Sequence, residues 1–375
     1  VMIIMALDHS REYFHSLAMT SNPLDPDTTT GALYFTRWIT HFCAPIFVFL
    51  SGLSAFLSSQ KKTKNEASKF LIKRGIWLLF VEIVIVNFGL TFNPLFNFII
   101  LQVIWALAWS MILLAIFSRI STKLVLIIGL AIIAGHNILN HIDLPQSGTG
   151  AYAIKILFTA FGTIVPVGEG YLIGFFYAIL PWTGIFFVGY AVGKWYAKGF
   201  NARVRKKNLL ISGTFLTLLF IGLRSLNVYG DPFPRKEFGD LFKNFLSFMD
   251  ASKYPPSLIF TGMTIGPAML LLAISENFKG IVNRIISLYG SVPFFYYILH
   301  FYLLHSILVI VFFATGNGPD KIIGPTPFLF RPVDFGFGLI VVYGVWIFVV
   351  AILYKPCKWF KEYKDTHTQW WLKYI

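Results

Sequence analysis

The residues best suited to acid–base chemistry gather near the start of the chain. The stretch VMIIMALDHSREYFH places five ionisable side chains directly behind an apolar run: Asp8, His9, Arg11, Glu12 and His15. Helix neighbours three and four apart share a face, which groups Asp8 with Arg11, Glu12 and His15, while His9 points about 100° away. Because Asp8 and Arg11 can neutralise each other, His9 is left to face the bundle interior. We expect function from Asp8 and His9, and an ion-paired helix end from Arg11 and Glu12.

A second polar pair lies in the next apolar segment. Arg37 and His41 are four residues apart and share a helix face. Pro45 follows four residues later, and its ring clashes with the carbonyl of His41, so we expect the helix to kink there. A kink beside an imidazole suits a site built on broken helix geometry. The alternative is a packing kink with a hydrogen-bonded structural histidine.

Other buried polar residues are spread along the chain. An ionisable side chain inside a membrane costs about 2.5 kcal/mol or more, so each one needs a partner, a water-filled cavity or a function. For Glu82 a carboxylate held by an Arg or Trp of a neighbouring helix is favoured over catalysis. In SVPFFYYILHFYLLH, His300 follows Tyr297 at helical spacing, while His305 is turned off that face. This spacing and the lack of an HExxH motif argue against a metal site.

The composition indicates that membrane helices position these side chains. The chain has 375 residues, of which 56% are hydrophobic and 13% are charged. The net charge of +14 would suit a nucleic-acid-binding protein if the basic residues formed one face. They flank apolar spans instead, so we expect membrane lipids and no nucleic acid as partners.

The apolar runs predict an all-α polytopic membrane bundle. A bilayer needs about 20 mostly apolar residues per helix, and about ten runs approach that length: 1–18, 33–57, 72–92, 96–117, 123–140, 171–193, 208–226, 257–275, 290–314 and 333–354. Lys and Arg gather in alternate connections, which predicts that both termini are cytoplasmic. We expect one domain over 1–375, a first helix that begins before Val1, and a cytoplasmic tail over 355–375. The outer connections 141–170 and 227–256 are long, and EFGDLFKNFLSF in the second predicts a short surface helix.

Several stretches resemble one enzyme family. LDHSREYFH, LYFTRWITHFCAPIFVFLSGLSAFL, PWTGIFFVGY, KYPPSL and GSVPFFYYILH are similar to bacterial members of the heparan-α-glucosaminide N-acetyltransferase catalytic-domain family, within a wider transmembrane acyltransferase superfamily. The resemblance implies transfer of an acetyl group from cytosolic acetyl-CoA to a sugar amine or hydroxyl beyond the membrane, here a bacterial cytoplasmic membrane. The superfamily carries an Arg, ten residues and a His in its first helix, and His9 matches that His. Lysosomal animal members have Asn there and a catalytic His further on, which makes His15 a rival base.

Histidine suits this chemistry, because attack on a thioester needs a base that works near neutral pH. We expect His9 or His15 to be the base and Asp8 to orient it. Arg37 and His41 are expected to bind the acyl oxygen or the acceptor, donating where negative charge develops. The full set of expected residues comprises catalytic Asp8, His9, His15 and His41, substrate-binding Arg37, Glu82, Lys253, Tyr297 and His300, and CoA-binding Lys69, Lys73 and Arg74.

The same residues also allow other functional interpretations. Lys69, Lys73 and Arg74 are most often simple membrane anchors on the cytoplasmic side. Buried Asp, His, Arg and Glu also describe a proton-coupled small-molecule transporter, although the sequence shows no matching inverted halves. The acyl chain length, the acceptor and the oligomeric state, including a homodimer, are left open by the sequence.

Overall fold

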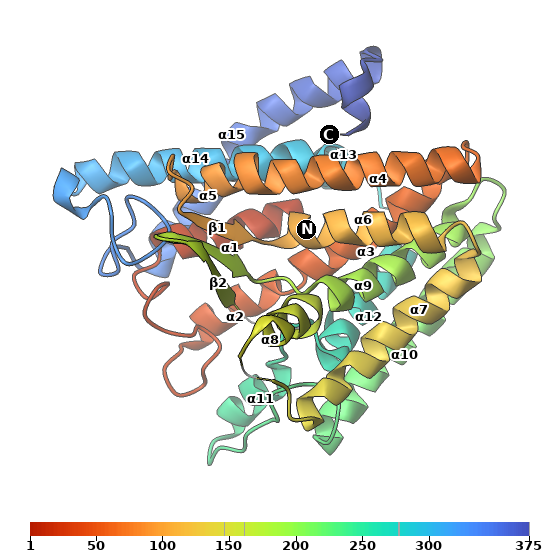
Figure 1. The fold of residues 1–375 in the computed structure, drawn as a ribbon, viewed down its shortest axis with the longest axis horizontal. Helices are drawn as coiled ribbons and strands as arrows, with labels where there is room; N and C mark the ends of the chain where they lie inside the picture. The colour runs from red at the N-terminus through yellow and green to blue at the C-terminus, as the bar shows by residue number, and fades with distance from the viewer. Residues whose placement is uncertain (146, 161, 277, 375) are drawn as a thin grey trace. The chain divides into compact units, whose positions relative to one another are not determined.

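The computed structural model describes residues 1–375 except 146, 161, 277 and 375. Of these four, 146 and 161 belong to the expected outer connection and 375 to the expected tail. Figure 1 shows the chain as a ribbon coloured from red at the N-terminus to blue at the C-terminus. The chain divides into two compact units. Unit 1 comprises Val1–Cys43, Ile83–Phe98 and Phe278–Ile375, and unit 2 comprises Ala44–Glu82 and Ile99–Asn277.

Unit 1 is helical and is centred on the first helix of the chain. Here α1 packs against α2, α14 and α15, and α5 packs against α14. The α-helices of this unit are α1 (Met2–Phe14), α2 (Gly31–Thr40), α5 (Asn87–Thr91), α13 (Ile281–Ser291), α14 (Pro293–Ala314) and α15 (Leu339–Thr366). Two 3₁₀ turns, Pro319–Lys321 and Trp370–Lys373, complete it, and a π-helical stretch, Val81–Val86, spans the boundary with unit 2. These contacts surround α1 with other helices, which explains why most of its side chains are buried.

Unit 2 holds the remaining helices and a small sheet. Its α-helices are α3 (Cys43–Ser59), α4 (Lys64–Phe80), α6 (Val103–Phe117), α7 (Thr122–Gly135), α8 (Thr149–Ile154), α9 (Ile179–Val192), α10 (Ala202–Leu226), α11 (Leu241–Met249) and α12 (Leu258–Ser275). Shorter helical turns cover His136–His141, Lys155–Thr159 and Gly193–Tyr196. The sheet has the order β1–β3–β2, formed by β1 (Phe98–Leu101), β3 (Tyr171–Phe175) and the antiparallel β2 (Thr163–Gly168).

Side-chain caps set where several helices begin. The hydroxyl of Thr30 accepts from the backbone N–H of Leu33 at the start of α2. Thr63 and Glu66 form a capping box at the start of α4. Such caps satisfy backbone donors that have no partner within the helix.

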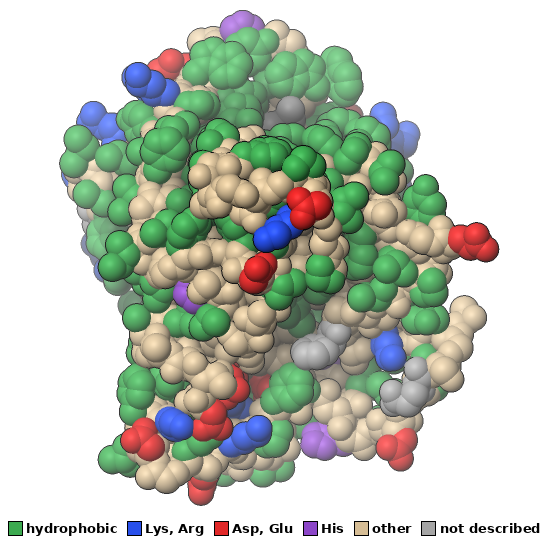
Figure 2. All heavy atoms as spheres, turned by 90° about the vertical axis from the view of Figure 1, so that its left-hand side faces the viewer, with side chains coloured by type: hydrophobic (Ala, Val, Ile, Leu, Met, Phe, Trp, Pro, Cys, Tyr) green, Lys and Arg blue, Asp and Glu red, His purple; other side chains and the backbone are tan. Residues whose placement is uncertain are grey.

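Six helical segments of the described chain are long and apolar enough to cross a membrane. They are Gly31–Ser59, Thr122–His141, Ala202–Leu226, Leu258–Ser275, Pro293–Ala314 and Leu339–Thr366, and Val103–Phe117 is a shorter apolar helix. Figure 2 shows a face on which hydrophobic side chains are widespread and charged ones are scattered. The helical membrane character is therefore confirmed, while ten spans and cytoplasmic termini stay predictions.

The structure corrects the all-α expectation at the sheet. The runs 96–117 and 171–193 were expected to be helical throughout, but each begins with a strand, β1 or β3, before its helix. The outer connection 141–170 likewise contains α8 and β2. The strand sequences FIIL and YLIGF are rich in β-branched and aromatic residues, which pack well on a pleated sheet.

Two local predictions are confirmed. The helix breaks where Pro45 was expected to kink it, because α2 ends at Thr40 and α3 begins at Cys43. The surface helix predicted in EFGDLFKNFLSF is α11, capped by the side chain of Asp240, and it exposes Leu241 and Phe242.

Candidate functional site

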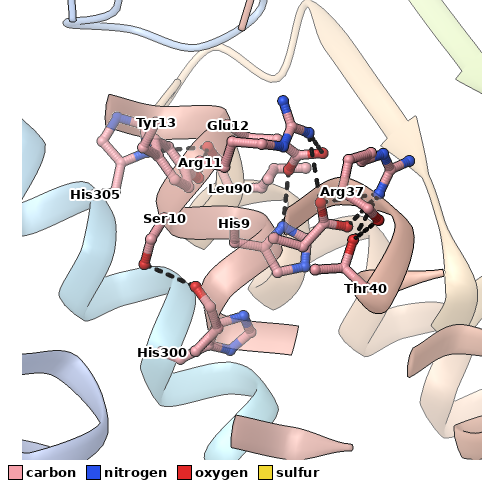
Figure 3. Close-up of polar contacts among 12 residues, drawn as sticks. His9, Ser10, Arg11, Glu12, Tyr13, Arg37, Thr40, Leu90, His300 and His305 are labelled. Atoms are coloured by element: carbon pink, nitrogen blue, oxygen red, sulfur yellow. Dashed lines mark hydrogen bonds and ion pairs between the residues drawn. The ribbon is translucent and has the colours of Figure 1, made fainter. Parts of the chain in front are cut away.

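A carboxylate–imidazole pair lies on α1 in unit 1 (Figure 3). Oε2 of Glu12 lies 2.8 Å from Nδ1 of His9, one helical turn earlier. The His9 side chain is 12% exposed and that of Glu12 is 33% exposed, so the carboxylate lies at the more open end of the pair. An ionised carboxylate only accepts hydrogen bonds, so Nδ1 of His9 carries the proton and Nε2 of the neutral ring carries the lone pair. Nε2 is therefore the basic atom of the pair.

Asp8 is paired with two arginines beside this dyad. Nη1 of Arg37 on α2 donates to Oδ1 and Oδ2 of Asp8 at 2.9 and 2.7 Å. Nη2 of Arg11 lies 3.4 Å from Oδ1 of Asp8, which confirms the expected Asp8–Arg11 pair. The same Nη1 of Arg37 donates to the hydroxyl of Thr40 at 3.1 Å. This network fixes the Arg37 guanidinium next to α1, as Figure 3 shows.

His300 on α14 faces His9. Their ring centroids are 5.2 Å apart, and the Phe301 ring contacts both imidazoles at centroid distances of 4.4 Å for His9 and 4.3 Å for His300. His300 is fully buried, and its Nδ1 makes a hydrogen bond with the backbone carbonyl oxygen of Tyr297. The two imidazoles are therefore neighbours in unit 1, and the apolar ring of Phe301 packs against both.

His15 lies just beyond the end of α1, in extended backbone. Its Nδ1 accepts from the backbone N–H of Leu17 at 3.2 Å, and its carbonyl oxygen accepts from Nη2 of Arg331 at 2.7 Å. Arg331 is almost fully buried and also donates to the carbonyl oxygens of Pro332 and Phe335. Burial lowers the pKa of the Arg331 guanidinium to about 10. Hydrogen bonds to backbone and to Arg331 therefore hold His15 at the end of α1, where its Nδ1 is engaged by the backbone N–H of Leu17.

Two further candidates from the sequence also lie in unit 1. His41 is buried in the turn that follows α2, where its backbone N–H donates to the carbonyl oxygen of Trp38. Tyr297 is buried on α14, with its ring centroid 5.6 Å from that of His300. By contrast, His305 points elsewhere, with its ring nitrogens near the carbonyl oxygens of Leu90 and Leu329.

Unit 2 contains the remaining candidates. Glu82 is fully buried and its Oε1 accepts from the backbone N–H of Gln102, the residue that precedes α6. The backbone N–H of Trp105 in the first turn of α6 also interacts with Glu82, so the expected Trp takes part through its backbone, at a helix N-terminus where a carboxylate is favoured. Lys253 is 8% exposed, and its ammonium lies 5.0 Å from the ring centroid of Tyr254. On α4, Lys69 and Lys73 are exposed and Arg74 is partly buried.

The contact of Glu12 with His9 is the one that sequence reasoning missed. Glu12 was expected in an ion-paired helix end, and its Oε1 does lie 3.9 Å from Nη2 of Arg11. Its closer contact is His9, three residues earlier. The same three-residue rule that placed Asp8 with Arg11 would have found this pair.

The arrangement is suited to proton transfer and to binding a developing negative charge. His9 and Glu12 supply a base with a carboxylate that stabilises its protonated form, and Arg37 supplies a fixed cation nearby. Within the described residues, no group of three or more His, Cys, Asp or Glu side chains could hold a metal ion.

Comparison with known families identifies a matching family model. A family model described as heparan-alpha-glucosaminide N-acetyltransferase, catalytic, matches residues 2–230. These residues include α1, α2 and the His9–Glu12 pair. A search of curated proteins finds no match for the chain.

Proposed function

The chain belongs to the heparan-alpha-glucosaminide N-acetyltransferase catalytic family and is a membrane acetyltransferase, and we propose that it transfers an acetyl group from acetyl-CoA to a sugar amine. The observation that carries the proposal is the His9–Glu12 contact inside the matched residues. A sugar hydroxyl is the alternative acceptor. We propose that donor and acceptor approach from opposite sides of a bacterial cytoplasmic membrane, with both termini in the cytosol.

His9 is the general base in this proposal. The acceptor nitrogen attacks the thioester carbonyl carbon, and the C–S bond breaks as the C–N bond forms. Nε2 of His9 takes a proton from the nitrogen, and Glu12 stabilises the imidazolium that results. A positioned base of this kind contributes about 10²–10⁴-fold to a rate. The contact of His9 with Glu12 favours it over His15, whose ring nitrogen is engaged by the backbone N–H of Leu17.

Arg37 stabilises the oxyanion that forms on the acyl carbon. Asp8 holds the guanidinium through two hydrogen bonds, so this cation is fixed before the reaction begins. Fixed donors are effective at developing charge because they need no reorganisation during the reaction. His41, in the turn after α2, is assigned to the same group of acyl or acceptor contacts.

The remaining sequence candidates are assigned to substrate binding. Lys69, Lys73 and Arg74 are proposed to bind the phosphates of acetyl-CoA, because cations on α4 are chemically suited to them. Lys253 and Glu82 are proposed as further substrate contacts in unit 2. Tyr297 is proposed as an acceptor contact in unit 1.

A proton-coupled carrier is the competing function, and thioester chemistry separates the two. Purified protein in detergent, supplied with radiolabelled acetyl-CoA and glucosamine, is expected to release free CoA in step with labelled N-acetylglucosamine. Detergent removes the two compartments that a carrier needs, so a carrier would leave the thioester intact. An unchanged acetyl-CoA pool across amino-sugar and hydroxyl acceptors would contradict the proposal.

A further inference from the structure

The proposed mechanism gives no role to Nε2 of His300, which is a buried nitrogen. Its side chain is fully buried, and Nε2 has no hydrogen-bond partner among the described residues. A buried polar atom that is left without a hydrogen-bond partner is destabilising. Because the His300 ring lies beside the candidate base His9, we expect Nε2 of His300 to gain a hydrogen-bond partner during the reaction.

The tautomer of His300 follows from its other nitrogen. Nδ1 is hydrogen-bonded to the carbonyl oxygen of Tyr297, and a carbonyl oxygen can only accept. Nδ1 therefore carries the hydrogen, and Nε2 of the neutral ring carries a lone pair. His9 has the same arrangement, with Glu12 in place of the carbonyl oxygen. Unit 1 thus presents two basic nitrogens on rings whose centroids are 5.2 Å apart.

The two histidines differ in their access to water. His9 is paired with Glu12, whose side chain is 33% exposed. His300 is fully buried, and the Phe301 ring packs against both imidazoles. A proton on His9 is therefore one carboxylate away from solvent, whereas the His300 side chain has no exposed surface through which to lose a proton.

We propose that His300 is the second proton acceptor of the acetyl-transfer site. This rests on the proposed function, in which the acceptor is an amine that arrives largely as an ammonium ion. Such an amine loses one proton before its lone pair can attack and a second as the amide forms. His300 takes the first proton and returns it to the CoA sulfur as the C–S bond breaks. His9, the general base of the attack, takes the second and releases it to water past Glu12, so that the products are amide, CoA thiol and one released proton.

The test compares two acceptors that differ by one proton. Methyl glucosaminide is largely protonated at pH 7, whereas its N-hydroxy analogue is largely neutral and has only one proton to lose. His300→Asn removes the basic nitrogen and keeps an amide donor that can reach the carbonyl oxygen of Tyr297. We expect His300→Asn to lower kcat/KM by about 10²-fold for the glucosaminide, with a much smaller loss for the analogue. Added imidazole is expected to restore part of the activity toward the glucosaminide.

His300→Gln is the second variant, to be used if His300→Asn does not fold. His305→Asn is the matched control, because it removes another buried histidine of α14, whose two ring nitrogens each lie 2.9 Å from a backbone carbonyl oxygen, of Leu90 and of Leu329. Any loss in this control is expected to be equal for the two acceptors. Equal losses for both acceptors in the His300 variants, with an active wild type, would overturn the assignment of His300 and leave the proposed function standing. A wild type inactive toward both acceptors would overturn both.

Discussion

Replacing His9 by Gln is expected to lower acetyl transfer by about 10²–10⁴-fold, the usual contribution of a positioned general base. Gln keeps a polar group of similar reach but cannot take up a proton. Glu12 would then stabilise no imidazolium, so the acceptor nitrogen would have to lose its proton to water. The measurement is the initial rate of N-acetyl sugar formation by purified protein in detergent at saturating acetyl-CoA.

Two further variants show whether a loss of activity in His9→Gln is specific to that histidine. His141→Gln changes an exposed histidine of unit 2 and is expected to keep the wild-type rate. His15→Gln tests the rival base at the end of α1. Full activity in His9→Gln together with a large loss in His15→Gln would transfer the role of base to His15.

Asp8→Asn is expected to have the largest effect on stability, a loss of about 3–5 kcal/mol, as is usual when one partner of a buried ion pair is removed. The Asp8 side chain is 8% exposed and pairs with both Arg37 and Arg11, whose side chains are 12% and 6% exposed. Asn would leave two buried guanidinium groups without their shared carboxylate. The measurement is the midpoint of thermal unfolding in detergent.

The matched control for Asp8 is an exposed carboxylate. Glu237, with a side chain that is 80% exposed, pairs only with Arg235 among the ion pairs of the described chain. Glu237→Gln is expected to change stability by less than about 1 kcal/mol. Equal unfolding midpoints for Asp8→Asn and Glu237→Gln would show that the Asp8 network contributes little.

Local sequence rules predicted those features that depend on neighbours along the chain. The helix break near His41 follows from a steric clash of Pro45 within one helical turn. The contact between Asp8 and Arg11 follows from helical spacing, and the structure has it at 3.4 Å. Apolar runs predicted the membrane helices because the bilayer sets their length.

Contacts that depend on packing or on side-chain rotamers could not be predicted from spacing along the sequence. Arg37 reaches Asp8 from another helix, and no spacing rule relates these residues until α1 and α2 pack together. Glu12 could pair with Arg11 or with His9 by spacing alone, and side-chain rotamers decide between them. The strand at β1 was missed because a short apolar run fits a buried helix as well as a strand.

The most direct test of the proposed function is acetyl transfer across a bilayer. Proteoliposomes containing the purified protein would hold glucosamine inside, with acetyl-CoA added outside, and the sugar would be identified by mass. We expect N-acetylglucosamine to accumulate inside vesicles with the wild-type protein and to be nearly absent with His9→Gln. Glucosamine that leaves the vesicles unmodified while acetyl-CoA stays intact would contradict the account and identify a carrier.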